Sequence, residues 1–233
     1  MQNAAETFER RTTTDVVFEK LLDDISSLTL LPGAKLSESE IAQRFGVSRQ
    51  PVRDAFNRLE NLDLLLIRPQ RATEVRGFSM KHIAHARFVR LAVEMEVVRT
   101  ACTVWDAECA DILDDNLALQ KSAVENEQPE QFHTLDYQFH KLICDLGGLP
   151  MAFDTIEECK KKVDRLCILS LDRRDNFATL LDDHNKLADA LRRGDLPDAT
   201  SVARLHFSRL DETINDIHKT HSTYFEQERP KLV

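Results

Sequence analysis

The sequence predicts a mainly α-helical protein of two domains, with one short β-hairpin at the end of the first domain. Gly and Pro are scarce among the 233 residues, at 6 and 7, and helix-favouring residues are abundant. Apolar residues recur at helical spacing over most of the chain. Only over residues 62–77 does the pattern change to two short extended runs around a polar turn. We therefore expect a domain of residues 1–77, followed by an all-helical bundle of residues 78–233 with about six or seven helices.

The first domain is expected to contain three helices before the hairpin, after a polar tail over residues 1–10. The expected helices run from Thr13 or Thr14 to about Ser27, from Glu38 to Phe45, and onward from about Ser48. Ser37 precedes the second helix and Glu40 follows three residues later, which predicts a capping box. Gly46 then allows a tight turn into the third helix. Helix, turn, helix and hairpin form the order of a winged helix-turn-helix.

The third helix begins with polar and basic side chains, as a helix that enters the major groove requires. We expect six residues to contact DNA: Ser48, Arg49, Gln50 and Arg53 on this helix, and Arg68 and Arg71 at the tip of the hairpin. The whole chain has a net charge of −9, but residues 44–76 carry seven Arg and four acidic residues. A locally basic segment beside an acidic body suits a DNA-binding module. A helical domain with a solvated, Arg-rich helix is the alternative.

Composition limits the cellular setting. No apolar run approaches the roughly 20 residues of a membrane span, and the N-terminus has no apolar segment typical of a secretory signal. We therefore expect a cytoplasmic protein without a membrane partner. The five cysteines are Cys102, Cys109, Cys144, Cys159 and Cys167. Without Cys-x-x-Cys spacing they are expected to be reduced thiols and small apolar core residues.

Four polar residues interrupt apolar stripes in the second domain. Asp136 and His140 are four residues apart on one stripe, and His184 and His206 each lie on another. A buried polar group without a partner costs about 1–3 kcal/mol. One divalent ion would satisfy all four side chains, and three imidazoles with a carboxylate suit zinc, nickel, iron or manganese. Alternatively, each histidine is a core residue with its own partner.

The remaining histidines show no shared pattern and are expected at the surface. They are His82, His85, His133, His218 and His221.

The first domain resembles the GntR family of bacterial regulators. Gly46-Val47-Ser48-Arg49 and Pro51-Val52-Arg53 match its signature, within a similar stretch of about 45 residues. The resemblance implies a winged helix-turn-helix in which Arg49 and Arg53 contact the operator. The wing departs from the family pattern, because Ala72 stands where the family usually has a glycine and Asn61-Leu62-Asp63-Leu64 replaces the usual glycine before the wing.

Residues 79–220 resemble the ligand-binding FCD domain of the FadR-type branch of that family. The motif from Arg90 to Glu94 matches its opening, and Asp136-x-x-x-His140, His184 and His206 match its metal constellation in order. The resemblance implies that these four residues coordinate a divalent metal, for which we expect zinc first. It also implies a carboxylate effector, such as a sugar acid. Arg90 is a candidate anchor for the effector, or else forms a structural ion pair with Glu94.

The sequence thus predicts an effector-responsive bacterial transcription regulator, a repressor that binds a palindromic operator as a homodimer and is not an enzyme. Three alternatives remain open. A direct metal sensor would respond to the ion alone. A metal-dependent hydrolase or lyase would use open positions on the metal, but the sequence shows no general base beside the histidines. An acyl-CoA sensor is known among branch members that lack the metal residues, which are complete here.

Overall fold

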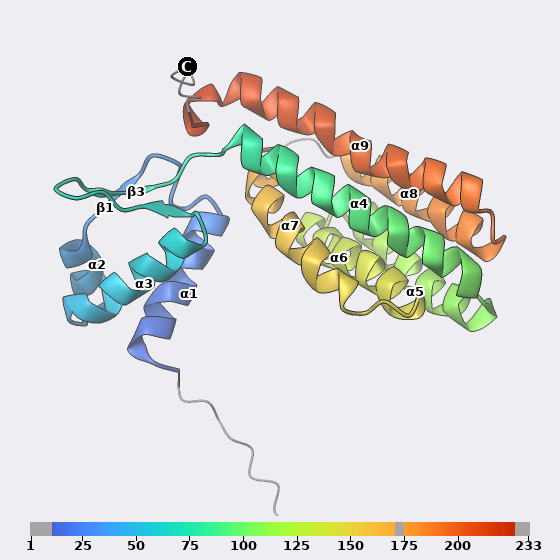
Figure 1. Ribbon diagram of the computed structural model, residues 1–233, viewed down its shortest axis with the longest axis horizontal. Helices are drawn as coiled ribbons and strands as arrows, with labels where there is room; N and C mark the ends of the chain where they lie inside the picture. Colours follow the sequence, from blue (N-terminus) through green and yellow to red (C-terminus); the bar gives the residue numbers. More distant parts are fainter. Residues whose placement is uncertain (1–10, 171–174, 227–233) are drawn as a thin grey trace, which may run out of the picture. The chain divides into compact units, whose positions relative to one another are not determined.

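The computed structural model describes residues 11–170 and 175–226, and the tail expected over residues 1–10 lies outside them. The described residues are mainly helical, with one small sheet (Figure 1), which confirms the predicted fold class. The chain divides into two compact units. The first unit comprises the residues up to Phe78 together with the segment that starts at Thr223, and the second is Ser79–Ser222. Residues 223–226 thus belong to the first unit, although they follow the second in the sequence.

The first unit is a three-helix core with a small antiparallel sheet. Its elements are α1 (Thr13–Ser26), β1 (Lys35–Leu36), α2 (Glu38–Phe45), α3 (Arg49–Asn61), β2 (Leu65–Leu66) and β3 (Thr73–Val75). The apolar stripes of α1 and α3 pack together, and Leu21 and Phe56 are fully buried between them. The strand order is β1-β3-β2. The hairpin of β2 and β3 was predicted; β1 was not, because two residues are too short to show a period.

The expected capping box at Ser37 and Glu40 is wrong. Ser37 does precede α2, but its side chain makes no cap hydrogen bond; its hydroxyl instead lies 2.7 Å from that of Ser39. A second serine two residues on competes for the hydroxyl that would cap the helix. The first unit has a capping box at the start of α1 instead, where Thr12 and Asp15 each accept a hydrogen bond from the other's backbone N–H.

The second unit is a helical bundle. Its elements are α4 (Met80–Val104), α5 (Ala107–Glu125), α6 (Pro129–Leu146), α7 (Ala152–Cys167), a 3-10 turn (Ile168–Ser170), α8 (Asp175–Arg192) and α9 (Leu196–Thr220), with a further 3-10 turn at Ser222–Tyr224. Six α-helices among the described residues agree with the prediction. The break between α4 and α5 was not predicted. It lies at Asp106, whose carboxylate accepts from the Cys109 N–H and caps α5. Part of the break expected at residues 172–176 lies outside the described residues.

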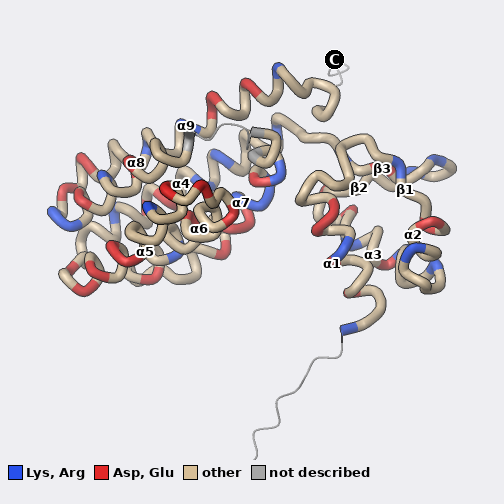
Figure 2. The backbone as a smooth tube through the Cα atoms, turned by 180° about the vertical axis from the view of Figure 1, so that it is seen from behind, with Lys and Arg blue, Asp and Glu red and all other residues tan. Residues whose placement is uncertain are grey.

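The bundle packs α4 against α7 and α9, α5 against α6 and α8, and α8 against α9. Their inward faces form one apolar core around Phe139, Ile156 and Leu187. Residues of both charges are spread along the helices (Figure 2), as is typical of helices with one solvated face. Charged and imidazole side chains inside this bundle are therefore exceptions that need partners.

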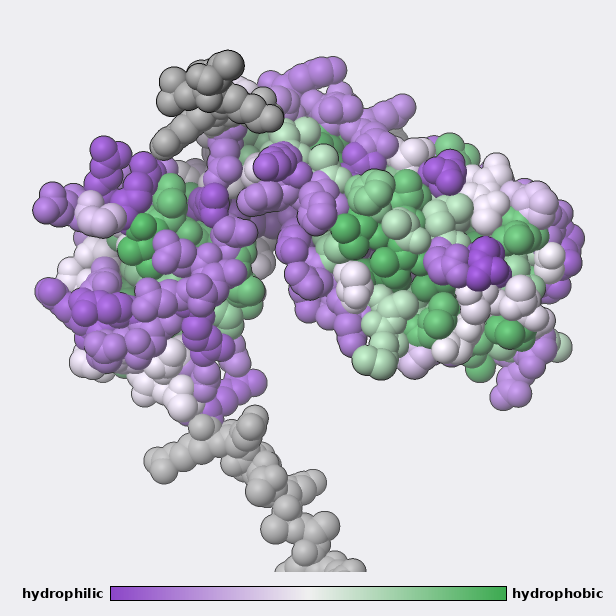
Figure 3. All heavy atoms as spheres, viewed as in Figure 1, coloured by the Kyte–Doolittle hydropathy of each residue, from purple (hydrophilic) through white to green (hydrophobic). Residues whose placement is uncertain are grey.

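The bundle also presents an apolar patch at its surface (Figure 3), over the face that α4 occupies in the same view. On that helix Phe88 is 70% exposed and Val104 is 52% exposed. Within the described residues, no helix combines the length and apolar character needed to cross a membrane. Cys102, Cys109, Cys144 and Cys159 are free thiols.

Candidate metal centre and nucleic-acid interface

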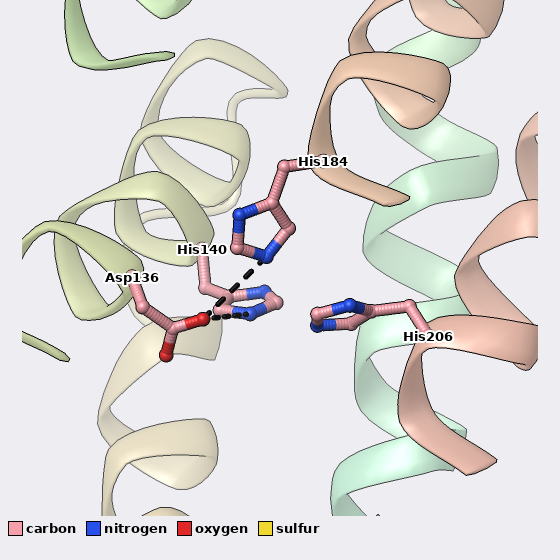
Figure 4. Close-up of side chains that lie close together, drawn as sticks. All are labelled: Asp136, His140, His184 and His206. Carbon is pink, nitrogen blue, oxygen red and sulfur yellow. Dashed lines mark ion pairs between the residues drawn. The ribbon is translucent and has the colours of Figure 1, made fainter. Parts of the chain in front are cut away.

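Four buried side chains from three helices converge inside the bundle (Figure 4). Asp136 and His140 project from successive turns of α6, His184 comes from α8, and His206 from α9. One potential ligand atom from each side chain lies within 4.8 Å of the others. The structure thus brings together all four residues that the sequence singles out as metal ligands.

One carboxylate oxygen lies close to two of the imidazoles. Asp136 Oδ1 is 3.6 Å from His140 Nε2 and 3.5 Å from His184 Nε2. The His206 ring centroid lies 5.4 Å from that of His140 and 4.6 Å from that of His184. These spacings place the side chains around a common point rather than in separate hydrogen-bonded pairs.

A chain of hydrogen bonds fixes the tautomer of His184. Asn116 Nδ2 donates to the Leu135 carbonyl at 3.3 Å, which leaves Asn116 Oδ1 to accept from Gln120 Nε2 at 2.7 Å. Gln120 Oε1 must then face His184 Nδ1, at 2.8 Å. Because an amide oxygen can only accept, His184 Nδ1 carries the hydrogen and Nε2 keeps its lone pair. The network therefore aims a free lone pair at the centre of the cluster.

His140 is oriented in the same way by a carboxylate. Its Nδ1 lies 2.7 Å from Glu94 Oε2 on α4, so Nδ1 donates and Nε2 faces Asp136. Burial opposes a charge on this imidazole, but Glu94 and Asp136 together outweigh burial and raise the pKa of His140. A carboxylate on the outer nitrogen of a histidine is the usual support of a metal-binding imidazole, which it orients and makes more basic.

His206 is turned toward a second carboxylate. Its Nδ1 lies 3.7 Å from Asp183 Oδ2, and Asp183 accepts two hydrogen bonds from Arg209. Burial lowers the pKa of His206, and lowers that of His184 well below its ordinary value. Both imidazoles are therefore neutral near pH 7, as metal ligands must be.

The donor set fits a divalent ion. His184 Nε2 and His206 Nδ1 are buried without a hydrogen-bond partner among the described residues. Leaving a buried polar atom unsatisfied costs about 1–3 kcal/mol. An ion bound by three imidazoles and Asp136 would give the His184 lone pair a partner and is the chemistry typical of zinc and related metals.

Arg90 belongs to the same cluster. Its Nε lies 2.5 Å from Glu94 Oε1 and its Nη2 lies 3.3 Å from His140 Nε2. The structural ion pair with Glu94, one of the two alternatives for Arg90, is therefore formed. The guanidinium nevertheless remains within reach of the metal cluster, so the ion pair leaves the effector-anchor hypothesis open.

Sequence reasoning missed four supporting residues: Gln120, Lys160 and Asp183, and Glu94 as a partner of His140. Gln120 and Asn116 do show a signal, since they lie on the buried stripe of α5 with Leu113 and Leu117. A polar pair on an apolar stripe indicates a buried network. Lys160 and Asp183 show no comparable signal, because charged residues are frequent around them in the sequence.

The residues expected to contact DNA lie on α3 and around the hairpin, and most of them are exposed. Ser48, Arg49 and Gln50 are exposed at the start of α3, and Arg71 is exposed between β2 and β3. Two of the arginines are engaged by carboxylates. Arg53 forms a two-point ion pair with Glu38, at 3.1 and 3.0 Å. Arg68 lies 3.4 Å from Glu74.

The five remaining histidines lie apart from the cluster. His82, His85, His133 and His218 are exposed and His221 is half-buried.

The first unit, with two helices joined by a tight turn and followed by a wing, defines a winged helix-turn-helix protein of the DNA-binding class. Comparison with known proteins specifies the family. The profile of bacterial regulatory proteins of the gntR family matches residues 13–75, and that of the FCD domain matches residues 86–209. The chain belongs to the gntR family of transcriptional regulators and carries an FCD domain.

Individual relatives agree with this assignment. The chain is 35% identical to the HTH-type transcriptional repressor RspR of Escherichia coli K12, over 91% of this chain and 93% of that protein. It is 26% identical to the gluconate operon transcriptional repressor of Bacillus subtilis 168, over 87% and 84%. Among solved structures, a GntR regulator from Rhodococcus sp. RHA1 has a TM-score of 0.67 at 23% identity, covering 87% of this chain and 97% of that one. Escherichia coli McbR/YncC has a TM-score of 0.66 at 20% identity, covering 91% and 100%. These structures share the fold.

Proposed function

We propose that the protein is a repressor whose operator affinity is set by a small organic acid bound at a divalent metal in the bundle. Operator binding is assigned to the first unit, and sensing and dimerisation to the second unit, Ser79–Ser222. The repressor relatives support the first assignment. A repressor of bacterial genes would act in the cytoplasm.

The observation that carries the sensing role is the buried cluster with a free lone pair. Neutral His184 presents Nε2 to the carboxylate of Asp136, and nothing else within the described residues accepts or donates there. The ion pair of Arg90 and Glu94, on α4, borders the same cluster. A metal here would act as a Lewis acid that binds an anion's oxygen. The four ligands would be Asp136, His140, His184 and His206, with zinc first and nickel, iron or manganese as alternatives.

The effector is expected to carry a carboxylate. Arg90 offers a planar pair of N–H donors that suits a carboxylate, and it is held beside the cluster by Glu94 at 2.5 Å. A sugar acid or another small hydroxy acid could place one oxygen at the metal and its carboxylate toward Arg90. The relative named as a gluconate operon repressor makes such acids sensible first probes.

DNA recognition is assigned to α3 and the wing. Ser48, Arg49, Gln50 and Arg53 would enter the major groove, while Arg68 and Arg71 would contact the backbone or minor groove. One chain supplies one reading helix, so a palindromic operator needs two chains. The exposed apolar side chains of α4, Phe88 above all, are where we expect the second copy to pack.

The helices that carry the cluster offer a route by which effector binding in the bundle would change the operator affinity of the first unit. The ligands come from α6, α8 and α9, and α4 carries Arg90 and Glu94 on the helix that follows the first unit directly in sequence. An acid can change operator affinity only by as much as its affinities for two arrangements of these helices differ.

The test measures operator affinity with and without an acid. A duplex selected from a random library by the protein itself is titrated by fluorescence anisotropy, using zinc-loaded and chelator-treated protein, with gluconate, lactate and citrate as probes. At least one acid should change operator affinity in zinc-loaded wild type and have no effect on an Asp136→Asn, His140→Ala double variant. If that variant responds like wild type, the effector does not bind at the metal. If zinc alone changes operator affinity and none of the acids does, the protein is a direct metal sensor.

A further inference from the structure

Lys160 is a buried cation that touches the metal cluster from outside. It lies on α7 and its side chain is only 4% exposed. Its Nζ is 2.5 Å from Asp136 Oδ2 and 4.2 Å from the centre of the Tyr137 ring. Burying an ammonium is unfavourable unless a carboxylate compensates it. The position of this lysine is therefore set by Asp136.

The two oxygens of Asp136 have different partners. Oδ1 faces His140 Nε2 and His184 Nε2, at 3.6 and 3.5 Å. Oδ2 faces away from the imidazoles, to Lys160. An ion placed among the three histidines would therefore meet one oxygen of this carboxylate, because the ammonium holds the other.

We propose that Lys160 is a positioning residue that keeps Asp136 a one-oxygen ligand and thereby leaves a coordination position for the effector. The inference rests on the proposed metal site and specifies how that site accepts an anion. A carboxylate that binds through both oxygens occupies two positions on the ion. With Oδ2 held by Lys160, three imidazoles and one oxygen occupy four positions, so an ion that accepts a fifth ligand keeps that position for the anion.

The charges around the cluster support the same conclusion. Arg90 pairs with Glu94, and Lys160 pairs with Asp136. Within each pair the carboxylate neutralises the cation. Neither carboxylate is therefore left to neutralise the charge of a bound divalent ion. At low effective dielectric such a charge strongly favours an anionic ligand. Without Lys160, Asp136 would neutralise half of that charge itself.

The test compares Lys160→Met with the charge-preserving control Lys160→Arg, in the full chain. Infrared difference spectra of Zn²⁺ binding report the mode of coordination, because the two carboxylate stretching bands lie farther apart for one-oxygen binding than for two-oxygen binding. Asp136→Asn identifies the bands. Wild type and Lys160→Arg should show the wide separation and Lys160→Met the narrow one. Unchanged bands in Lys160→Met would overturn the inference.

A second readout uses Co²⁺ with acetate as the probe anion, followed by the absorption of the bound cobalt. Lys160→Met should bind Co²⁺ at least as tightly as wild type and acetate about tenfold more weakly, in the range typical of residues that support metal ligands. If Co²⁺ and acetate both bind more weakly, Lys160 only holds Asp136 in place, and the inference fails while the metal site stands. If wild type retains no metal, the proposed function fails as well. Lys160→Gln replaces Lys160→Met if circular dichroism shows that the latter does not fold.

A different observation concerns the segment that follows α9. Phe78 N–H donates to the Tyr224 carbonyl, and Glu226 N–H donates to the Phe78 carbonyl, both at 2.8 Å. The rings of Phe78 and Phe225 lie 5.4 Å apart. A Cβ added at Gly77 would approach the Tyr224 carbonyl oxygen to 2.9 Å. The close backbone approach therefore requires glycine at this position.

We infer that this segment, residues 223–226, is a second connection through which metal binding stabilises the end of the first unit, an inference that rests on the proposed metal site. The bridge lies two residues before α4 begins and a few residues after α9 ends. Those helices carry Glu94 and His206, so a metal that orders the bundle would also order both attachment points of Phe78.

Hydrogen exchange tests this connection in the full chain. Adding Co²⁺ should slow amide exchange over residues 73–78 in wild type and in the exposed control Thr223→Ala. The slowing should disappear in Gly77→Val and Phe225→Ala, whose cobalt content stays equal to that of wild type. The same slowing in Gly77→Val, or none in metal-loaded wild type, would overturn the inference.

Discussion

In the first unit, Arg53 and Arg68 pair with carboxylates that are themselves partly exposed, those of Glu38 and Glu74. In the second unit Asp136 and three histidines are buried and converge from three helices. Exposed charges are hydrated, so their positions alone do not indicate that a ligand binds. Buried polar groups must be satisfied inside the molecule. The unpartnered nitrogen of His184 is therefore the stronger indication of a ligand. The exposed arginines indicate DNA binding only because they lie on the helix and hairpin of a winged helix-turn-helix.

The largest expected effect is loss of metal stabilisation when a buried ligand is removed. Zn²⁺ at about a thousandfold excess over its dissociation constant should stabilise wild type by about 4 kcal/mol. The stabilisation should appear as a zinc-induced rise in melting temperature. His184→Ala should abolish this rise, whereas the exposed His133→Ala should retain it. An equal zinc-induced shift in His184→Ala, measured by calorimetry, would show that the ion binds elsewhere.

A smaller effect is expected from the hydrogen-bond chain behind the ligands. Gln120→Leu removes the acceptor that fixes His184 Nδ1 at 2.8 Å. Zinc affinity should fall about 10- to 100-fold, as for other supporting residues of metal ligands. Gln131→Leu, on the exposed face of α6, is the matched control. Competition titration with a chromophoric chelator measures both, and equal affinities would mean that His184 needs no such support.

In the first unit, Arg49→Ala should lower operator affinity by about 1–3 kcal/mol while leaving zinc content unchanged. The reason is its exposed place at the start of α3. Arg99→Ala, an exposed arginine of the bundle, should bind the operator like wild type. Anisotropy titrations in which Arg49→Ala matches Arg99→Ala would remove α3 as the reading helix.

Glu38→Gln should raise operator affinity, whereas Arg49→Ala lowers it. Glu38 holds Arg53 at two points, and exposed ion pairs contribute about 0.2–1 kcal/mol. Releasing Arg53 and removing a negative charge near the DNA should raise operator affinity a few-fold, more at low salt than at high salt. A loss of affinity would mean that Glu38 is needed to orient Arg53.

The smallest effect concerns the pair of Asp15 and Arg58. Hydrogen bonds from Thr12, and then from Arg58, lower the pKa of Asp15 from 3.8 to about 2. A lowered pKa in the folded state stabilises the protein above the unfolded value, and that stability is lost as the pH falls toward 2. Asp15→Asn should therefore melt below wild type by a constant margin from pH 8 to pH 5, and the margin should vanish near pH 2. A margin that grows below pH 4 would contradict the assignment.

Much of the fold follows from the sequence because its signals are local. Gly46, the apolar stripe of α3 and the polar turn before Thr73 each act within a few residues. The same holds for Asp136 and His140, one helix turn apart. The partners of the ligands on other helices could not be predicted, since the pairing of Glu94 with His140, of Gln120 with His184 and of Lys160 with Asp136 is formed only by tertiary packing. The β1 strand was missed although its signal is local, because two residues are too few to show an alternating pattern.

The central claim is that the buried cluster holds one divalent ion per chain, and metal content tests it most directly. Three proteins are compared: wild type, His133→Ala, and a double variant that carries His184→Ala and His206→Ala. Each is reconstituted with zinc, freed of loosely bound metal by gel filtration, and analysed for zinc and protein. The account predicts one zinc per chain in wild type and in His133→Ala, and almost none in the double variant. Wild type without bound metal, or a double variant that retains as much as wild type, would contradict it.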